Sequence, residues 1–400
     1  CLRNFERAAD GGAVWNYHVP TGNGLYVDIS VKIEILPGKI QTRISFLRRE
    51  MRGHDYLKED ASVKLIVRPD LEDRNFHCAT KASGLESVWP GKVLFKERGF
   101  EFTPAPGRTL SLTVSSGRFT PEAEWSYMIW QPNEADRGLD PYSDTYSPGY
   151  FDFDLIDGSA VQIAASIQTA DEPEKLQPAR PVPADFHPET DLGIEYSMLN
   201  AMRAFVVKRG SLKTVIAGYP WFLDWGRDTL IAARGLVAAR EFREDVKAIL
   251  LQFARFAEHG TIPNIIHGDS VGNRDTSDAQ LWLFTAAEDL CKAEHSTAFL
   301  STEVKDGKNL LDILEDIACD LIDGTPNGIR MDAESGLIFS PAHFTWMDTN
   351  YPAGTPREGY PIEIQALWFA ALRFLSTVSA TPDRWKNLAE KVRNSIGTLF

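Results

Sequence analysis

The chain has 400 residues, which exceeds one ordinary domain and predicts two. Hydrophobic residues make up 43% and charged residues 24%, a balance typical of a soluble globular protein with a large core. With 42 basic and 56 acidic residues the net charge is −14, and no Lys/Arg block occurs. Nucleic acid is therefore not expected as a partner, because phosphate binding needs a basic face, and a neutral or cationic substrate fits better.

Cysteine spacing and hydropathy exclude several further classes. The four cysteines are widely scattered and form no CxxC pair, so reduced thiols and a cytoplasmic location are expected. No apolar run reaches the ~18 residues of a membrane span and no secretory signal is present, so no membrane partner is expected. Neither a metal nor a cofactor is predicted, because HExxH, GxSxG and phosphate-binding glycine motifs are absent.

The first part of the chain has the hydrophobic pattern of strands. From residue 23 to about 167 the pattern has period two, as in half-buried antiparallel strands, and Pro37-Gly38 predicts an early turn. Strands are expected near 27–35, 40–46, 63–67, 93–95, 100–102, 110–114, 126–130, 150–155 and 161–167. About ten short strands with frequent turns predict an N-terminal antiparallel β-sandwich over residues 1–170.

The pattern changes after a proline-rich stretch. Residues 171–188 hold five prolines among charged residues, which predicts a stiff, extended linker. Beyond it, period 3.6 predicts helices near 192–207, 229–240, 245–258, 278–292, 310–322, 362–375 and 385–399. Long loops rich in Pro, Gly, Asp and Trp join them. Residues 189–400 are therefore expected to form an α-solenoid or an α/α toroid rather than a four-helix bundle.

The stretch 217–228 reads Ala-Gly-Tyr-Pro-Trp-Phe-Leu-Asp-Trp-Gly-Arg-Asp and precedes an apolar helical run. Trp221 and Trp225 accompany the adjacent Arg227 and Asp228. A guanidinium and a carboxylate hydrogen-bond sugar hydroxyls in pairs, while indole rings cover the apolar face of a pyranose. The alternative is structural, because Asp228 is well placed to cap a helix and Arg227 to pair with it. This stretch alone leaves both interpretations open.

Two further loop-to-helix junctions resemble the first. One runs from Gly-Thr-Ile-Pro-Asn at 260–264 to Ser-Asp at 277–278, and the other from Thr-Trp-Met-Asp at 345–348 to Glu363. Each places an acidic residue beside a tryptophan, at or just before a helix, and the helical spacing predicts that the junctions meet at one end of a bundle. Glycoside hydrolysis needs such a set, with one acid to protonate the leaving oxygen and one carboxylate to activate water.

Ordinary structural roles compete with these assignments. Asp278 follows Ser277 and would make a good helix cap. Glu363 would suit the dipole of a first helical turn. Asp348 lies in a loop that continues through Asn350, so it caps no predicted helix.

These stretches resemble the amylo-α-1,6-glucosidase (glycogen debranching enzyme) family of inverting glycoside hydrolases. The resemblance covers the chain from about residue 125 and rests on 137–140, 147–151, 217–228, 260–264, 278–282, 345–348 and 355–364. It implies an (α/α)6 barrel whose loops at one end bind a single terminal glucose. The implied partner is an α-glucan, either glycogen or a limit dextrin.

The resemblance also implies roles for individual residues. It places the general acid at Asp348, with Asp278 as the runner-up acid or as a subsite carboxylate. Trp225, Arg227 and Asp228 match the segment that holds the hydroxyls of the released glucose. Further substrate-binding residues are expected at Trp221, Asn264, Trp346, Arg357 and Glu363.

Two departures from the family pattern carry expectations of their own. Arg274-Asp275 stands where the family usually has Tyr-Asn, which would alter the subsite next to the scissile bond. The barrel needs twelve helices and seven are predicted, so only about the first half of the toroid is expected. The resemblance then puts the general base beyond Phe400, and the 400-residue chain alone is expected to be inactive.

The resulting hypothesis is an inverting glycoside hydrolase that releases glucose from α-1,6 branch stubs of a glycogen-like α-glucan. Three alternatives stay open: a glucoamylase-like α-glucosidase, a phosphorylase on the same barrel, and a non-catalytic glucan-binding protein. A phosphorylase would use bound phosphate in place of the base. A binding protein would release no sugar.

Overall fold

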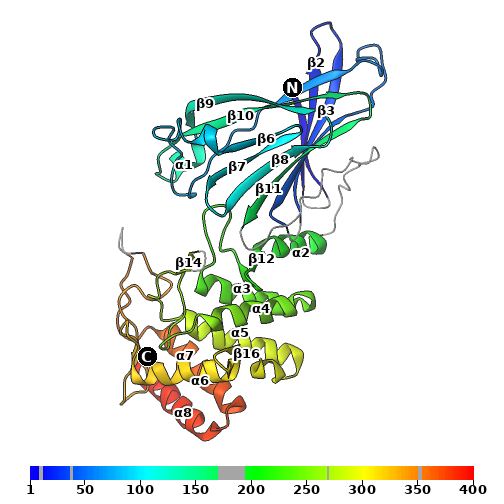
Figure 1. The fold of residues 1–400 in the computed structure, drawn as a ribbon. Coiled ribbons are helices and arrows are strands. Elements are labelled where there is room, and N and C mark those ends of the chain that lie inside the picture. Colours follow the sequence, from blue (N-terminus) through cyan, green and yellow to red (C-terminus); the bar gives the residue numbers. More distant parts are fainter. Residues whose placement is uncertain (9–11, 37–38, 170–193, 268–269, 350–353) are drawn as a thin grey trace. The chain divides into compact units, whose positions relative to one another are not determined.

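The computed structural model describes residues 1–8, 12–36, 39–169, 194–267, 270–349 and 354–400 (Figure 1). The turn predicted at Pro37-Gly38 and the linker predicted at 171–188 lie outside these residues. The chain divides into two units, Cys1–Ser197 and Met198–Phe400. Each unit has a hydrophobic core of its own.

Unit 1 is built from two antiparallel sheets. The larger has the order β1-β2-β3-β4-β11-β8-β7-β6, with strands β1 (Leu2–Arg7), β2 (Ala13–Pro20), β3 (Tyr26–Ile35), β4 (Gln41–Arg48), β11 (Ala160–Thr169), β8 (Arg108–Val114), β7 (Gly99–Ala105) and β6 (Val93–Lys96). The smaller has the order β5-β10-β9, with β5 (Val63–Val67), β10 (Tyr142–Leu155) and β9 (Arg118–Trp130). The connections contain η1 (Trp89–Lys92) and α1 (Pro132–Asp136).

A single core joins the two sheets. Phe100 and Phe102 on β7 and Phe151 and Phe153 on β10 are at most 2% exposed and belong to one buried cluster. Period-two alternation puts these rings on one face of each strand, and burying each ring stabilises the unit by about 1.5–3 kcal/mol. The expectation of an antiparallel β-rich first part is therefore confirmed.

Strands β1 and β2 were not expected from the sequence, and β9 and β10 begin earlier than expected. Strand β1 is an edge strand whose side chains are almost all exposed, so it has no buried face to mark in the sequence. Strand β9 is similar, because Glu122 and Glu124 lie in an exposed stretch of it. Exposed strands lack the alternation on which the prediction depended.

Unit 2 contains helices at the predicted places: α2 (Ile194–Phe205), α3 (Gly226–Ala238), α4 (Arg243–Arg255), α5 (Ala279–Glu294), α6 (Leu310–Asp323), α7 (Ile362–Val378) and α8 (Pro382–Leu399). The division between the units falls within α2. Short elements that the pattern does not predict fill the connections: η2 (Arg240–Phe242), η3 (Ala298–Ser301), β12 (Val206–Arg209), β13 (Leu212–Val215), β14 (Ile266–His267), β15 (Ser270–Val271), β16 (Glu303–Lys305), β17 (Lys308–Asn309), β18 (Arg330–Met331) and β19 (Ile338–Phe339). The expectation of a helical second part is confirmed.

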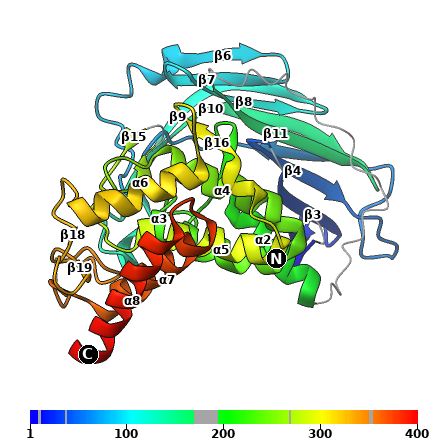
Figure 2. The same ribbon diagram turned by 90° about the horizontal axis from the view of Figure 1, so that it is seen from below.

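The helices of unit 2 alternate between two sets. Helix α3 packs against α5, and α5 against α7. Helix α4 packs against α3 and α5, α6 against α4 and α7, and α8 against α7 (Figure 2). One buried cluster runs through both sets and includes Leu230, Phe253, Phe284, Ile317 and Trp368, each at most 1% exposed. This packing fixes the starts of α3, α5 and α7 relative to one another.

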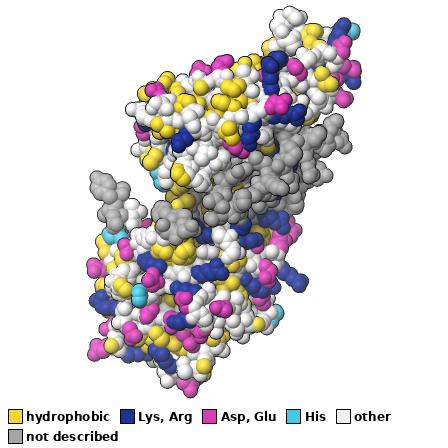
Figure 3. All heavy atoms as spheres, viewed as in Figure 1, with side chains coloured by type: hydrophobic (Ala, Val, Ile, Leu, Met, Phe, Trp, Pro, Cys, Tyr) yellow, Lys and Arg dark blue, Asp and Glu magenta, His cyan; other side chains and the backbone are white. Residues whose placement is uncertain are grey.

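The described residues show no charged patch on the face of unit 2 drawn in Figure 3, no membrane-crossing helix, no metal-binding cluster and no disulfide. Basic and acidic side chains are interspersed on the face of unit 2 drawn in Figure 3. None of the described helices combines the length and the apolar character that a membrane crossing requires. Across the same residues, no three His, Cys, Asp or Glu side chains are grouped to hold a metal, and the four cysteines are free.

Candidate active site

Helices α3, α5 and α7 begin at the same end of unit 2. The N–H of Gly226, at the start of α3, donates to the carbonyl of Asn264 at 2.9 Å, in the loop before α5. Ser277, just before α5, places its hydroxyl 2.8 Å from that of Ser340. Ser340 in turn exchanges two backbone hydrogen bonds with Gly359, just before α7, at 2.7 and 2.9 Å. The three junctions therefore meet, as their spacing predicted.

One guanidinium joins these junctions. Arg227 Nε donates to Asp278 Oδ2 at 2.6 Å, and Nη1 donates to Asp348 Oδ2 at 3.0 Å. Nη2 donates to the carbonyl of Thr345 at 2.8 Å. Burial lowers the pKa of Arg227, but the charges and hydrogen bonds of the two aspartates outweigh it and raise the pKa above its usual value. A permanent positive charge thus binds two carboxylates from separate stretches of sequence.

Asp278 uses both carboxylate oxygens within the protein. Its side chain is only 5% exposed, with Oδ2 bound to Arg227 and Oδ1 accepting the Thr276 hydroxyl at 2.7 Å. Although Asp278 occupies the N-cap position of α5, it makes no capping hydrogen bond. The N–H of Ala279 donates instead to the Thr276 hydroxyl at 3.3 Å. The capping interpretation of Asp278 is therefore wrong, because Arg227 and Thr276 occupy the oxygens that a cap would use.

Asp348 has a different environment. Its side chain is 31% exposed and lies in a loop rather than at a helix start. Only Oδ2 is bound, by Arg227, and within the described part of the chain Oδ1 has no hydrogen-bond partner. Asp348 therefore presents one carboxylate oxygen that the described residues leave available.

Asp228 lies in the first turn of α3 and is exposed. The helix begins at Gly226 and its N-cap position is Trp225, so Asp228 is not the cap residue that the sequence allowed. Partial burial raises the pKa of its carboxyl, Arg227 lowers it, and the charges of Asp348 and Asp278 raise it again, so that the net pKa is above its usual value. A third carboxyl thus lies in the electrostatic field of the other two.

The raised pKa of Asp228 predicts a pH-dependent effect of Asp228→Asn. The folded protein binds the proton of the Asp228 carboxyl more tightly than the unfolded chain does. The stability that this proton contributes is therefore present below about pH 4 and is lost as the pH rises through the raised pKa. The variant cannot lose this contribution. We expect the Tm of the variant, relative to wild type, to rise between about pH 3.5 and about pH 7. A Tm difference that stays constant over this range would contradict the assignment.

Comparisons with known proteins identify the family of this chain. A family model described as amylo-α-1,6-glucosidase matches residues 200–400, and one described as glycogen debranching enzyme N terminal matches residues 1–162. The chain belongs to the amylo-α-1,6-glucosidase family. A glycogen debranching enzyme of Saccharomyces cerevisiae is 24% identical over 236 aligned residues. The match covers 44% of this chain and 15% of the yeast protein, so the chain spans a small part of that relative's length.

In this member of the amylo-α-1,6-glucosidase family, the start of α3 is held closely against the loop before α5. A Cβ added to Gly226 would lie 2.3 Å from the carbonyl oxygen of Pro263, so only glycine fits. Two buried polar atoms here have no protein partner in the described structure: the indole N–H of Trp225 and Oδ1 of Asn264. Such groups are normally satisfied by water or a ligand.

The remaining predicted site residues lie in the same loops, except Glu363, which lies in the first turn of α7. Trp346 is 57% exposed, and Trp221 is half-buried beside Tyr219 and Phe222, which are 53% and 51% exposed. Aromatic rings are thus accessible on two of the three junctions. Arg357 and Glu363 bind each other, with both carboxylate oxygens accepting from Nη2. Their ion pair ties the loop before α7 to that helix.

Some residues of the site were given no role from the sequence. Thr276 binds Asp278 through its hydroxyl, and a Thr two residues before an Asp carries no signal of its own. Thr345 binds Arg227 through its backbone carbonyl, a contact that does not depend on the type of side chain. The Arg274 guanidinium donates to the carbonyls of Phe256 and Thr261, so it joins the end of α4 to the loop that carries Asn264. An effect of Arg274 on a subsite stays a prediction.

Proposed function

We propose that this chain supplies the glucose-binding and proton-donating part of an inverting amylo-α-1,6-glucosidase, which releases glucose from α-1,6 branch stubs of a glycogen-like α-glucan. The family of the chain and the name of its yeast relative, a glycogen debranching enzyme, support a branched α-glucan as the substrate class. The observation that carries the proposal is the shared guanidinium, which brings Asp278 and Asp348 into one hydrogen-bonded group. Asp228 lies in the same electrostatic field.

Asp348 is our proposed general acid. A general acid must reach the leaving oxygen within hydrogen-bond distance, either directly or through one water. Asp348 keeps Oδ1 without a partner among the described residues, and its side chain is 31% exposed. Asp278 is 5% exposed with both oxygens engaged, so we assign it to holding Arg227 in place.

The charge of the cluster suits glycoside hydrolysis. Asp228 and Asp278, when ionised, set two negative charges against the one positive charge of Arg227, and Asp348 gains negative charge as it gives up its proton. This balance favours the positively charged, oxocarbenium-like transition state. Inversion also needs a second carboxylate, roughly 6.5–9.5 Å from the acid, to activate water. We assign that base to no residue of this chain.

We propose further that unit 1 is a β-sandwich and that unit 2 follows the plan of an (α/α)6 toroid. Helices α3, α5 and α7 would form part of the inner ring, and α4, α6 and α8 part of the outer ring. The support is their packing, with the inner three side by side and all three beginning at the site.

The substrate-binding roles follow from the positions of the side chains. We assign the rings of Trp221, Trp225 and Trp346 to the apolar faces of glucose, because sugars stack on indole surfaces. The amide of Asn264 would bind a hydroxyl, since its Oδ1 has no partner among the residues that the structure describes. The Arg357–Glu363 ion pair would form part of the rim.

The test is the anomer that the full-length natural protein releases from a dextrin with single α-1,6-linked glucose stubs. Proton NMR at early times is expected to show β-glucose first, with α-glucose appearing later by mutarotation. Release of α-glucose first would contradict inversion. A sugar phosphate formed only with added phosphate would indicate a phosphorylase, and faster release from linear α-1,4 chains a glucoamylase-like enzyme. Binding of the dextrin without release of any sugar would indicate a non-catalytic glucan-binding protein.

A further inference from the structure

Unit 1 exposes a pair of aromatic rings at the end of its smaller sheet. Trp130 on β9 and Tyr142 on β10 are paired across the strands, with ring centroids 5.3 Å apart and an interplanar angle of 63°. They are 52% and 37% exposed. Nearby on β9, Tyr127 and Met128 are 56% and 60% exposed. Exposed aromatic groups that lie together usually mark a binding surface.

Polar groups are fixed beside the rings. Lys81 Nζ donates to the carbonyl of Tyr142 and pairs with Asp140 Oδ2, both at 2.8 Å. The N–H of Tyr142 donates to Asp140 Oδ1 at 3.0 Å. Lys81 and Asp140 are both about half exposed and neutralise each other. The rings are therefore flanked by one donor and one acceptor group with no net charge, which suits a neutral, hydroxyl-rich ligand.

A β-bulge sets the direction of the end of β9. The pairing of β9 with β10 shifts register between Ser143 and Thr145, and Met128 adopts a positive φ of 56°. Asp144 fixes this geometry because its carboxylate accepts the N–H groups of Met128 at 2.9 Å and Ala82 at 2.8 Å. These hydrogen bonds lower the pKa of Asp144, so it stays ionised. Bulges that re-aim side chains are common next to functional sites.

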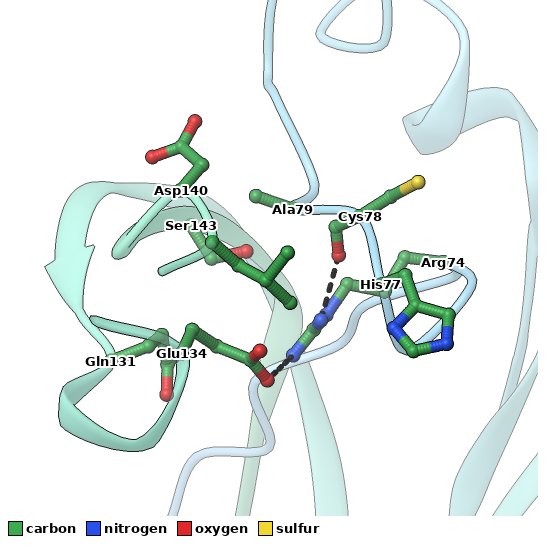
Figure 4. Close-up of a pocket in the computed structure, with 9 residues that line it drawn as sticks. Arg74, His77, Cys78, Ala79, Gln131, Glu134, Asp140 and Ser143 are labelled. Carbon is green, nitrogen blue, oxygen red and sulfur yellow. Dashed lines mark hydrogen bonds and ion pairs between the residues drawn. The ribbon is translucent and has the colours of Figure 1, made fainter. Parts of the chain in front are cut away.

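A small pocket beside this strand end does not serve as the ligand site. It is lined by residues that include Arg74, Glu134 and Ser143, and its cavity volume of about 10 Å³ holds about one water molecule (Figure 4). Arg74 is already committed, since it donates to the carbonyl of Cys78 at 2.7 Å and to Glu72 at 3.1 Å. Ser143 follows Tyr142 in the strand and is buried. The pocket is therefore too small to hold a glucose unit.

We propose that Trp130 and Tyr142 form a second α-glucan contact, on unit 1, which binds an outer chain of the branched substrate. This inference rests on the proposed function, because it takes its ligand class from the substrate of the site on unit 2. The rings cover the apolar faces of successive glucose units, and Lys81 and Asp140 bind their hydroxyls. A second contact raises the apparent affinity for a polymer and leaves the affinity for a short oligosaccharide unchanged.

Unit 1 contains a matched control. Phe5 and Trp15 are also paired across neighbouring strands, with ring centroids 5.2 Å apart, and Phe5 is 52% exposed. The next residue across the sheet from Trp15 is the apolar Val31. The control therefore pairs the exposed ring of Phe5 with the half-buried ring of Trp15, on different strands from those that carry Trp130 and Tyr142.

The test measures migration of the full-length natural protein in native gels that contain glycogen. Trp130→Ala and Tyr142→Ala are each expected to raise the dissociation constant for glycogen, measured from the retardation, about fivefold. The double variant is expected to raise it more. Trp130→Phe keeps a ring and is expected to stay within about twofold. Phe5→Ala should migrate like wild type. A double variant that glycogen retards as strongly as wild type would overturn the proposal. So would a Phe5→Ala variant that loses as much affinity for glycogen as the double variant.

Activity assays and footprinting separate this proposal from the function of unit 2. With the double variant, kcat/KM for the polymer is expected to fall while kcat/KM for a short branched oligosaccharide is unchanged. If the variants unfold, hydroxyl-radical oxidation of Trp130 and Tyr142 in the wild-type protein tests the proposal instead. Glycogen should protect both rings from oxidation. Rings that glycogen leaves unprotected would contradict the proposal. Wild type that binds glycogen through these rings without releasing glucose would refute only the catalytic function. A double variant that changes the oligomeric state but not the retardation would assign the rings to a second copy of the chain.

Discussion

Asp348→Asn in the full-length natural protein is expected to lower kcat for release of glucose from α-1,6 stubs by about 10³-fold, the range found when a general acid is removed. Asparagine keeps the size of the side chain and an oxygen that accepts from Arg227 Nη1, but it has no carboxylic proton to give. The loss should therefore fall on kcat, with little change in KM or Tm.

Asp289→Asn is the matched control for this experiment. Asp289 also accepts a hydrogen bond from an arginine, here from Arg234 Nε at 2.6 Å, but it lies within α5, away from the start of that helix, and belongs to no junction of the site. Its substitution should leave kcat unchanged. An Asp348→Asn variant with activity within a few-fold of wild type would remove Asp348 from the role of acid.

Arg227→Met is expected to lower the free energy of unfolding of unit 2 by about 3–5 kcal/mol and to abolish activity. The substitution leaves the carboxylate of Asp278, whose side chain is 5% exposed, without its cation, and frees Asp348 from its position. The large effect comes from the unpaired buried charge rather than from the loss of a favourable contact. Chemical denaturation followed by circular dichroism measures it, together with an activity assay.

Helix α3 provides the comparison for Arg227→Met. Arg234 binds Asp289 with the same Nε–Oδ2 distance of 2.6 Å, but the side chains are 39% and 27% exposed. Arg234→Met should therefore cost only about 0–1 kcal/mol. Adding Asp278→Leu to Arg227→Met should recover part of the stability, because no buried charge remains unpaired. Equal losses for the two arginine variants would show that burial of the Arg227 pair has no special importance.

Much of the helical unit could be predicted because its helices bury one apolar face. The ends of α6 were predicted almost to the residue from its apolar spacing. In the structure a capping box of Asn309 and Asp312 begins this helix, and Gly324 follows its last turn. The start of α3 was predicted three residues late. Trp225 occupies its N-cap position without a side-chain hydrogen bond, and packing against Pro263 and Asn264 rather than a capping residue begins the helix at Gly226.

The members of the site could be named from the sequence, but their partners could not. Acids near tryptophans at loop-to-helix junctions marked Asp278 and Asp348 as a pair of interest. That a single arginine from the first junction binds both carboxylates depends on how α3, α5 and α7 pack, which no local pattern contains. The same limit applies in unit 1, where the bulge at Met128 and its support from Asp144 arise from pairing between distant strands.

The most direct test of Asp348 as the proton donor is hydrolysis of α-D-glucosyl fluoride by the full-length Asp348→Asn variant. Fluoride departs with little help from an acid, whereas a sugar oxygen needs a proton. The variant should hydrolyse the fluoride at close to the wild-type rate while losing about 10³-fold on the α-1,6 stub. Equal losses on both substrates would contradict the account, because they would show that Asp348 serves binding or structure and donates no proton.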